Sequence, residues 1–220
     1  MVSGASRGIG RAVVERLLAA GFQVSAGVRE PRGLAESAVL QVQRYDAESL
    51  DSAQAWVAAA AARFGTLHGL VNAAGINAHF AVADADEAPL DQLWAVNVKA
   101  PLRLARLALP HLRACGSGRI VNVASLSGKR VANANAGYAI SKFAVMALTE
   151  ALRREGWEDG VRATALCPSF VETDMTARAD FPRAQMIKPA DLAVLTETLL
   201  LLPNTAVVAE LLVNCRLEAL

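Results

Sequence analysis

Short apolar runs alternate with longer amphipathic stretches along most of the chain. The apolar runs have the length of buried strands, and the stretches between them space their apolar positions three and four residues apart, which is typical of helices. The predicted strands are residues 1–3, 22–29, 39–45, 67–73, 120–123, 161–167 and 207–213. The predicted helices are residues 11–20, 49–64, 89–114, 138–152 and 189–202. This alternation predicts an α/β fold, a single doubly wound, Rossmann-like parallel sheet of seven strands with helices on both faces.

Two details of this pattern need comment. Only residues 1–3 precede the first loop, whereas a buried strand usually has about five or six residues, which leaves open whether residues upstream of Met1 are missing. Pro101 and Pro110 are expected to kink or interrupt the helix predicted at 89–114. No internal repeat or linker divides the chain, so residues 1–220 are predicted to form one domain.

Composition supports a buried sheet and argues against several other classes of protein. Hydrophobic residues make up 54% of the 220 residues, which suits strands covered on both faces. The net charge is +1, which gives no support for binding to nucleic acid or to anionic membranes. No apolar run approaches the ~20 residues needed to cross a bilayer, and the amino end carries no signal-like segment, so a cytoplasmic location is expected. The three cysteines and three histidines stand singly, so neither a disulfide framework nor a metal site is predicted.

A glycine-rich loop joins the first strand to the first helix. Its glycines are Gly4, Gly8 and Gly10, and such residues permit a tight turn and close approach of a ligand to the backbone. The N–H groups at the start of the following helix attract phosphate, which predicts a dinucleotide site. Arg11 and Ala12 follow Gly10 where a P-loop would have lysine and serine or threonine, so nucleotide hydrolysis is disfavoured. Taken alone, the loop is also compatible with ordinary turn chemistry.

A serine, a tyrosine and a lysine near the fifth strand form a candidate proton-transfer site. Ser125 comes at the end of that strand, and Tyr138 and Lys142 are four residues apart, which places them on one face of the helix that follows. A serine there can donate a hydrogen bond to a substrate oxygen. The tyrosine–lysine spacing is weak evidence by itself, because most such pairs are packing residues beside a solvated charge.

Taken together, these motifs resemble those of the short-chain dehydrogenase/reductases. The resemblance extends over essentially the whole chain and implies a nicotinamide-dependent oxidoreductase. Its matches are the loop from Ser3 to Gly10, Asn72-Ala73-Ala74-Gly75 after the fourth strand, Asn97, Ser125 thirteen residues before Tyr138, and Lys142 four residues after it.

The resemblance implies a role for each of four catalytic residues. Tyr138 would be the acid and base, Ser125 would orient the substrate carbonyl, and Asn97 would hold a water linking Lys142 to solvent. Lys142 would contact the cofactor ribose and lower the pKa of Tyr138. A free tyrosine has a pKa of about 10, and a lysine together with a cationic nicotinamide must supply roughly 4 kcal/mol to bring it to about 7.

The resemblance also implies the cofactor-binding residues. Asp46 is expected to contact the adenine, Asn72 and Gly75 to flank a ribose, and Val171 and Thr173 to hold the carboxamide. The family usually has asparagine at Ala73 and glycine at Ser169, so one ribose contact and the segment leading to Thr173 depart from its pattern. The whole predicted set is Gly4, Ser6, Arg7, Gly8, Ile9, Gly10, Arg29, Asp46, Asn72, Ala73, Gly75, Tyr138, Lys142, Pro168, Val171 and Thr173.

The end of the second strand indicates which dinucleotide binds. NAD enzymes of this fold place an acidic residue there to accept hydrogen bonds from the adenosine ribose, but here the position falls on Val28 or Arg29. Arg29 can hold a 2′-phosphate and Arg7 can add a second charge, so NADP(H) is predicted to be preferred, with NAD(H) as a second possibility. The alternative is that Arg29 is a solvated residue partly neutralised by Glu30.

The leading functional hypothesis is hydride transfer between NADP(H) and a small ketone or secondary alcohol. Its rival is a nucleotide-binding regulator with the same fold and no turnover, which the presence of all four catalytic side chains disfavours. A third hypothesis, sugar-nucleotide epimerisation, would need room for an added substrate domain. Residues 102–112 and the helix at 138–152 carry more apolar side chains than one face can bury, which predicts a homodimer or homotetramer that packs through them.

Overall fold

A seven-stranded, wholly parallel sheet forms the centre of the protein in a computed structural model, which describes residues 1–30 and 33–217. The strand order is β3-β2-β1-β4-β5-β6-β7, so the predicted doubly wound sheet is confirmed. Each predicted strand is present, and most are one to three residues shorter than the apolar pattern suggested. Their bounds are β1 Val2–Ser3, β2 Val24–Val28, β3 Leu40–Arg44, β4 Gly69–Asn72, β5 Arg119–Val123, β6 Arg162–Pro168 and β7 Glu210–Val213.

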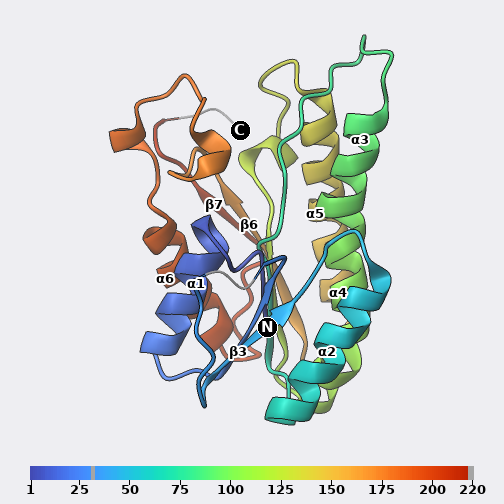
Figure 1. Cartoon of the computed structure of the whole chain (residues 1–220), viewed down its shortest axis with the longest axis vertical. Helices are drawn as coiled ribbons and strands as arrows, with labels where there is room; N and C mark the ends of the chain where they lie inside the picture. Colours follow the sequence, from blue (N-terminus) through green and yellow to red (C-terminus); the bar gives the residue numbers. More distant parts are fainter. Residues whose placement is uncertain (31–32, 218–220) are drawn as a thin grey trace.

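Helices cover both faces of the sheet (Figure 1). On one face, α1 (Gly8–Ala19) and α6 (Pro189–Leu201) pack together over a core that includes Val13, Val14 and Leu192. On the other, α2 (Leu50–Phe64), α4 (Ala100–Ala114) and α5 (Ala136–Glu155) enclose a second core around Trp56 and Leu112. The result is a three-layer arrangement whose strands are buried from both sides, as the high hydrophobic content requires.

The helix predicted at residues 89–114 is three elements. It begins as α3 (Ala88–Leu93), widens into a π-helical turn η1 (Trp94–Lys99), and continues as α4. Pro101 lies in the first turn of α4 and has no N–H to donate to the carbonyl of Asn97, four residues earlier, which favours the wider turn. The interruption therefore precedes Pro101. At Pro110 the helix is not interrupted, because α4 runs through it, and a kink there stays a prediction.

Two helix starts differ from the prediction. Helix α1 begins at Gly8, three residues before the predicted start, because its first turn contains the loop glycines, which carry no apolar side chain for the pattern to register. Helix α5 begins at Ala136, with Asn135 as its N-cap residue, so Tyr138 lies in its first turn. The remaining short helical turns are η2 (Leu126–Gly128), η3 (Asp174–Thr176) and η4 (Arg183–Gln185).

The strand order reverses between β1 and β4: from β1 the chain adds β2 and β3 on one side, and from β4 it adds β5, β6 and β7 on the other. At the carboxyl end of β1 lies Gly4, and Ala73 follows β4. A reversal of this kind opens a crevice at the carboxyl edge of the sheet, which is where ligands bind in doubly wound folds. The architecture thus places the glycine loop and the residues after β4 side by side.

The opposite edge of the sheet is closed by a buried arginine. Arg119, at the start of β5, is 6% exposed and donates to the carbonyl oxygens of Leu202, Gly118 and Gly160 and to Oδ1 of Asn204, at distances from 2.5 to 3.3 Å. Burial lowers the pKa of this guanidinium. One side chain therefore connects β5 to the α6–β7 connection and to the segment that leads into β6.

A second cavity, of about 280 Å³, lies beside the amino end of β1. It is lined by residues of β2, of the segment leading into β4, and of α1, among them Val24, His68 and Leu17. The α-amino group of Met1 donates to the carbonyl of Gly69 at 2.8 Å here, and burial lowers its pKa to about 5.

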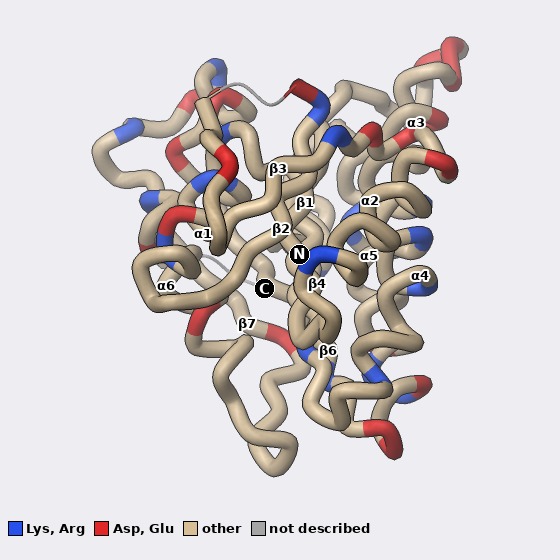
Figure 2. The backbone as a smooth tube through the Cα atoms, turned by 60° about the horizontal axis from the view of Figure 1, so that its bottom comes forward, with Lys and Arg blue, Asp and Glu red and all other residues tan. Residues whose placement is uncertain are grey.

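Charged residues of both signs are interspersed over the surface in the view of Figure 2, with acidic residues gathered in the loop before α3. No helix in the described part of the chain is long and apolar enough to cross a membrane. Among these same residues, no group of three or more histidine, cysteine or acidic side chains could hold a metal ion.

Candidate active site

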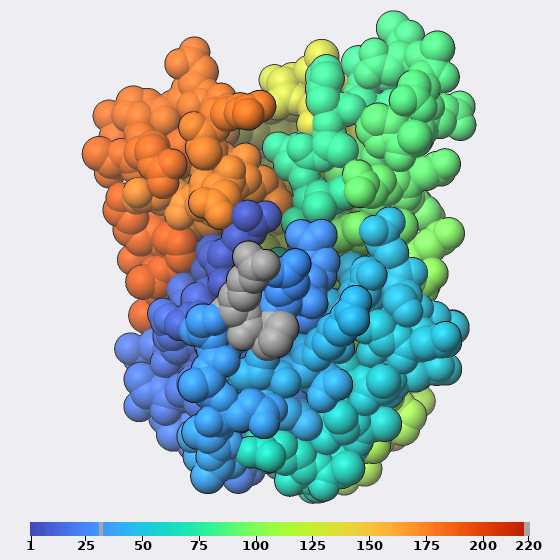
Figure 3. Space-filling view, in the orientation of Figure 1, coloured from blue at the N-terminus to red at the C-terminus, as the bar shows by residue number. Residues whose placement is uncertain are grey.

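A cavity of about 460 Å³ opens at the carboxyl edge of the sheet, at the crevice between β1 and β4. Figure 3 shows the molecule hollowed between the orange segment around residues 174–188 and the green segment that leads into α3. The cavity walls come from the glycine loop, from the ends of β2 and β3, and from the segments that follow β4 and β6. Of the predicted cofactor residues, those that line it are Gly4, Ser6, Arg7, Gly8, Ile9, Arg29, Asp46, Ala73, Gly75 and Thr173.

The glycine loop can bring a phosphate close to its backbone. Gly4 and Gly8 have φ angles of +68° and +57°, which side-chain-bearing residues rarely adopt. A Cβ on Gly10 would lie 2.4 Å from the carbonyl oxygen of Gly4, so only glycine lets the helix begin against the loop. Arg7, the N-cap residue of α1, gives no side-chain cap, and the first turn has no acidic residue, so its N–H groups are available to an anion. These features fit the pyrophosphate of a dinucleotide.

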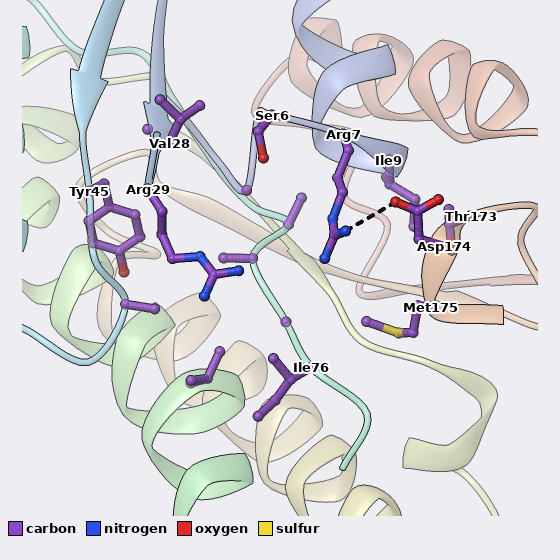
Figure 4. A pocket seen from close by; sticks show the side chains of 18 of the residues that line it. Ser6, Arg7, Ile9, Val28, Arg29, Tyr45, Ile76, Thr173, Asp174 and Met175 are labelled. Atoms are coloured by element: carbon purple, nitrogen blue, oxygen red, sulfur yellow. Dashed lines mark hydrogen bonds and ion pairs between the residues drawn. The ribbon is translucent and has the colours of Figure 1, made fainter. Parts of the chain in front are cut away.

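The far end of the cavity is formed by the ends of β2 and β3. The Arg29 side chain extends from the end of β2 into the cavity, past Val28 and Tyr45 (Figure 4). The Tyr45 ring packs against Trp56 with 4.8 Å between ring centroids, and the Asp46 backbone is fixed by the Ser52 hydroxyl, which accepts from its N–H at 2.8 Å. No acidic side chain stands at Val28, so the carboxylate typical of NAD enzymes is replaced by an apolar residue followed by a cation.

An ion pair crosses the cavity between the glycine loop and the segment after β6. Nη1 of Arg7 lies 3.1 Å from Oδ2 of Asp174, and the two side chains are 69% and 72% exposed (Figure 4). Exposed pairs of this kind contribute little to stability, so Arg7 remains available to a bound anion. Asp174 was not expected at this site from the sequence.

Ser125, Tyr138 and Lys142 meet at the side of this cavity, as their spacing predicted. Nζ of Lys142 lies 5.6 Å from the centroid of the Tyr138 ring and donates to the carbonyl of Val123 at 2.9 Å. Ser125 is the N-cap residue of η2 and hydrogen-bonds the Tyr138 side chain. A Cβ on Gly75 would lie 3.9 Å from Nζ of Lys142, so Gly75 is the point at which the cavity reaches the lysine.

The pKa of Tyr138 is not lowered by this arrangement alone. Burial raises it to about 12, and the hydrogen bond from Ser125 offsets only part of that rise. Burial also lowers the pKa of Lys142 to about 8, so the ammonium predominates at neutral pH. Without a cofactor the tyrosine is therefore a neutral phenol at neutral pH, and the joint action of lysine and cofactor stays a prediction.

The side-chain amide of Asn97 makes three hydrogen bonds within the protein. Oδ1 accepts from the Ile76 N–H at 2.9 Å, and Nδ2 donates to the Ile76 carbonyl and to Oγ of Ser141, both at 3.0 Å. The side chain thus joins the segment after β4 to α5 next to Lys142. Oδ1 keeps one lone pair that could accept from the predicted water, and that water stays a prediction.

Six predicted cofactor residues are not part of the cavity lining: Tyr138 and Lys142, described above, and Gly10, Asn72, Pro168 and Val171. Asn72 is buried in β4 and donates to Oδ1 of Asn122 on β5 at 2.8 Å, so its amide joins strands, and no partner for its own Oδ1 occurs among the described residues. Gly10 lies beneath the loop that lines the cavity. Pro168 ends β6, and Val171 is buried and pairs with Ile187.

Sequence reasoning missed several residues of the cavity wall. Tyr45, Ala47 and Glu48 follow the third strand, where the rule that ligands bind at carboxyl ends of strands could have found them. Gln92 and Val96 come from α3 and the π-helical turn, and no sequence signal placed that turn beside the cavity. The other additions are Gly27, Ala74, Ile76, Asn77, Asp174 and Met175.

The sequence and the fold both match known oxidoreductases. A family model for short chain dehydrogenases matches residues 1–183. The chain belongs to the short-chain dehydrogenase/reductase family. An agropine synthesis reductase of Rhizobium rhizogenes is 40% identical over all of this chain and 53% of its own length, so the chain spans about half the length of that relative.

Two solved structures share the fold of this short-chain dehydrogenase/reductase. An actinorhodin polyketide ketoreductase with NADPH has a TM-score of 0.85 at 28% identity, over 97% of this chain and 93% of its own. A 3-ketoacyl-(acyl-carrier-protein) reductase from Brucella melitensis with NADH has a TM-score of 0.86 at 25% identity, over 97% and 95%. Both neighbours hold a nicotinamide cofactor, and they differ in which one, NADPH in the first and NADH in the second.

Proposed function

We propose that this protein reduces a small ketone, or oxidises the corresponding secondary alcohol, with NADP(H). The observation that carries the choice of cofactor is Arg29, whose side chain extends into the cavity where NAD enzymes have a carboxylate. Arg29 makes no ion pair with any described residue, so its guanidinium can give a 2′-phosphate two charge-assisted hydrogen bonds. The reductase names of the relatives support the direction of reaction.

The residues around the cavity fit a dinucleotide from end to end. Arg29 and Asp46 would contact the adenosine end, the glycine loop and the start of α1 the pyrophosphate, and Thr173 the nicotinamide end. When bound in its reduced form, the cofactor supplies a hydride for the carbonyl carbon. Ser125 donates a hydrogen bond to the carbonyl oxygen, and Tyr138 gives its hydroxyl proton to that oxygen as negative charge develops there. The Lys142 ammonium stabilises the phenolate that is left.

Cofactor preference is the direct test of this proposal. We expect kcat/KM to be roughly 10- to 100-fold higher with NADPH than with NADH, because a charged hydrogen bond contributes about 1.5–3 kcal/mol. Arg29→Ala should remove most of the preference, and Val28→Asp should reverse it, because a carboxylate repels the phosphate and accepts from free ribose hydroxyls. The measurement is the loss of reduced-nicotinamide absorbance with a panel of carbonyl compounds.

Arg44→Ala is the matched control, since Arg44 pairs with Val28 at the end of β3 but does not line the cavity. It should leave the preference unchanged. Equal use of the two cofactors by the wild type would show that Arg29 does not bind the phosphate. Tight NADPH binding without turnover on any carbonyl compound would favour the rival hypothesis of a nucleotide-binding regulator.

The tyrosine pKa gives a second test. In the cofactor-free protein the pKa of Tyr138 is about 12, so its tyrosinate absorbance should be absent up to about pH 10. Oxidised NADP carries a positive nicotinamide ring, which favours the phenolate and should lower the pKa. The near-ultraviolet difference between wild type and Tyr138→Phe, titrated with and without NADP⁺, isolates this group. A Tyr138 tyrosinate signal near neutral pH without cofactor would contradict the assignment.

Self-association is expected through the layer that contains α4 and α5. Leu102, Ile140 and Phe143 are 42%, 47% and 44% exposed, whereas Val145 of α5 is buried in the monomer. These helices carry more apolar side chains than one face of the sheet can cover, and a partner subunit packed against them would bury the three exposed ones. We expect a dimer or tetramer in light scattering at micromolar concentration, and Phe143→Glu should weaken it. Val194→Glu is the control, because Val194 lies on α6 and is 45% exposed, and it should leave the association unchanged. A monomeric wild type would contradict the prediction.

A further inference from the structure

The side chain of Asn135 makes four hydrogen bonds just before the tyrosine helix. Its Oδ1 accepts from the N–H groups of Phe80, at 3.1 Å, and Tyr138, at 3.4 Å. Its Nδ2 donates to Oδ1 of Asn77 at 2.9 Å and to the carbonyl of Ala78 at 3.1 Å. Oδ1 therefore caps α5, and Oδ1 and Nδ2 together bind the segment from Ile76 to Phe80. We call this segment the arm.

Only a side-chain amide of this length can accept from the two N–H groups and donate to the Ala78 carbonyl at the same time. The two backbone N–H groups need an acceptor, and the Ala78 carbonyl needs a donor within reach of the same side chain. Aspartate would keep both acceptor contacts and remain a good N-cap, but it has no N–H to give to Ala78 or Asn77. The cap and the link to the arm can therefore be separated by one substitution.

The arm connects the dinucleotide cavity to the catalytic helix at both of its ends. Ile76 and Asn77 line the cavity. Asn97 holds the backbone of Ile76 and, through Ser141, the second turn of α5. Asn135 holds the other end of the arm and the N–H of Tyr138 itself.

Backbone contacts make the arm and the first turn of α5 fit tightly. The Gly137 N–H donates to the Phe80 carbonyl at 3.0 Å, and a Cβ on Gly137 would lie 2.9 Å from Cβ of Phe80. Phe80 and Gly137 are both buried. A displacement of the arm is thus passed directly to the residue next to Tyr138.

We propose that Asn135 is a positioning residue, which couples the cavity wall to Tyr138 so that a dinucleotide filling the cavity holds the tyrosine in its reactive position. This inference rests on the function proposed above. Asn135 acts through the arm and through Tyr138, and it has no contact with the reacting atoms.

Asn135→Asp separates the two roles of the side chain, with Asn133→Asp as matched control. Asn133 lies two residues earlier, and its Oδ1 accepts from the Asn135 N–H at 3.0 Å, a contact that aspartate keeps. We expect N135D to lower kcat about 10- to 100-fold, the range caused by small misplacement of a catalytic group, with the melting temperature and the KM for NADPH near those of N133D. A kcat within twofold of N133D would overturn the proposal, because a residue that only caps the helix would give that result.

Amide hydrogen exchange gives a readout that does not depend on turnover. In the wild type and in N133D, NADPH should slow exchange both in the glycine loop and at residues 136–141. In N135D it should slow exchange in the loop alone. Equal protection of residues 136–141 in N135D would refute the coupling even if no carbonyl substrate is found.

Failure of the proposed function would look different. If NADPH does not bind at all, the role of Asn135 is tested by amide exchange without cofactor at residues 76–80 and 136–141. Both segments should exchange faster in N135D than in N133D. Equal rates there would also overturn the role of Asn135.

Discussion

Replacing Tyr138 with phenylalanine is expected to lower kcat for carbonyl reduction at least 100-fold, the lower range for loss of a general acid. The substitution removes the phenolic proton beside Ser125 and Lys142, while the ring and its packing remain. Binding of NADPH, measured by fluorescence titration, should stay near the wild-type value, so the loss should appear in kcat. Activity within threefold of wild type would show that another group donates the proton.

Lys142→Met is the informative companion to that experiment. Lys142 is 6% exposed and lies beside Gly75 at the cavity, so its loss should reduce the rate and also weaken cofactor binding. If affinity for NADPH stays unchanged in this variant, Lys142 acts on Tyr138 alone and the predicted ribose contact is wrong.

The second large effect is on stability. Arg119→Met should destabilise the protein by roughly 3 kcal/mol or more, because it leaves the buried carbonyl of Gly160 and the partly buried carbonyl of Leu202 and amide of Asn204 without their donor. For a chain of this length that corresponds to a fall in melting temperature of about 6–12 °C, measurable by calorimetry.

Arg154→Met is the control for the stability experiment. The Arg154 side chain is 77% exposed, and its ion pair with Glu150 lies on the surface. We expect a change within about 0.5 kcal/mol. A similar melting temperature for the Arg119 and Arg154 variants would mean that water replaces the arginine without cost.

Much of this structure was predictable from local pattern. The strands and most helices appear where apolar periodicity placed them, and Tyr138 and Lys142 meet because four residues make about one helical turn. The carboxyl-edge rule also located the glycine loop and the residues after β4 correctly, since it depends only on strand order.

The rest could not be predicted, because tertiary contacts decide it. Asn72 follows the motif of a ribose ligand, and its Nδ2 donates to Asn122 on the neighbouring strand, a partner that the sequence does not reveal; the ribose contact stays a prediction. The π-helical turn around Asn97 has the same apolar spacing as an α-helix over so short a stretch. The sequence offers Asn135 only as a candidate helix N-cap, because its other partners Asn77, Ala78 and Phe80 lie more than 50 residues away.

Gly27 sets a limit on how this site could be redesigned. A Cβ there would lie 2.5 Å from the ring of Trp56, which is fully buried between β2 and α2. The cavity floor at Gly27 is therefore backbone packed directly on a tryptophan, and a larger residue at position 27 could be accepted only if α2 were repacked at the same time. Val28, the next residue, is 2% exposed and belongs to the core as well. Arg29 is exposed, so redesign of this part of the cavity can begin at position 29 without disturbing the core.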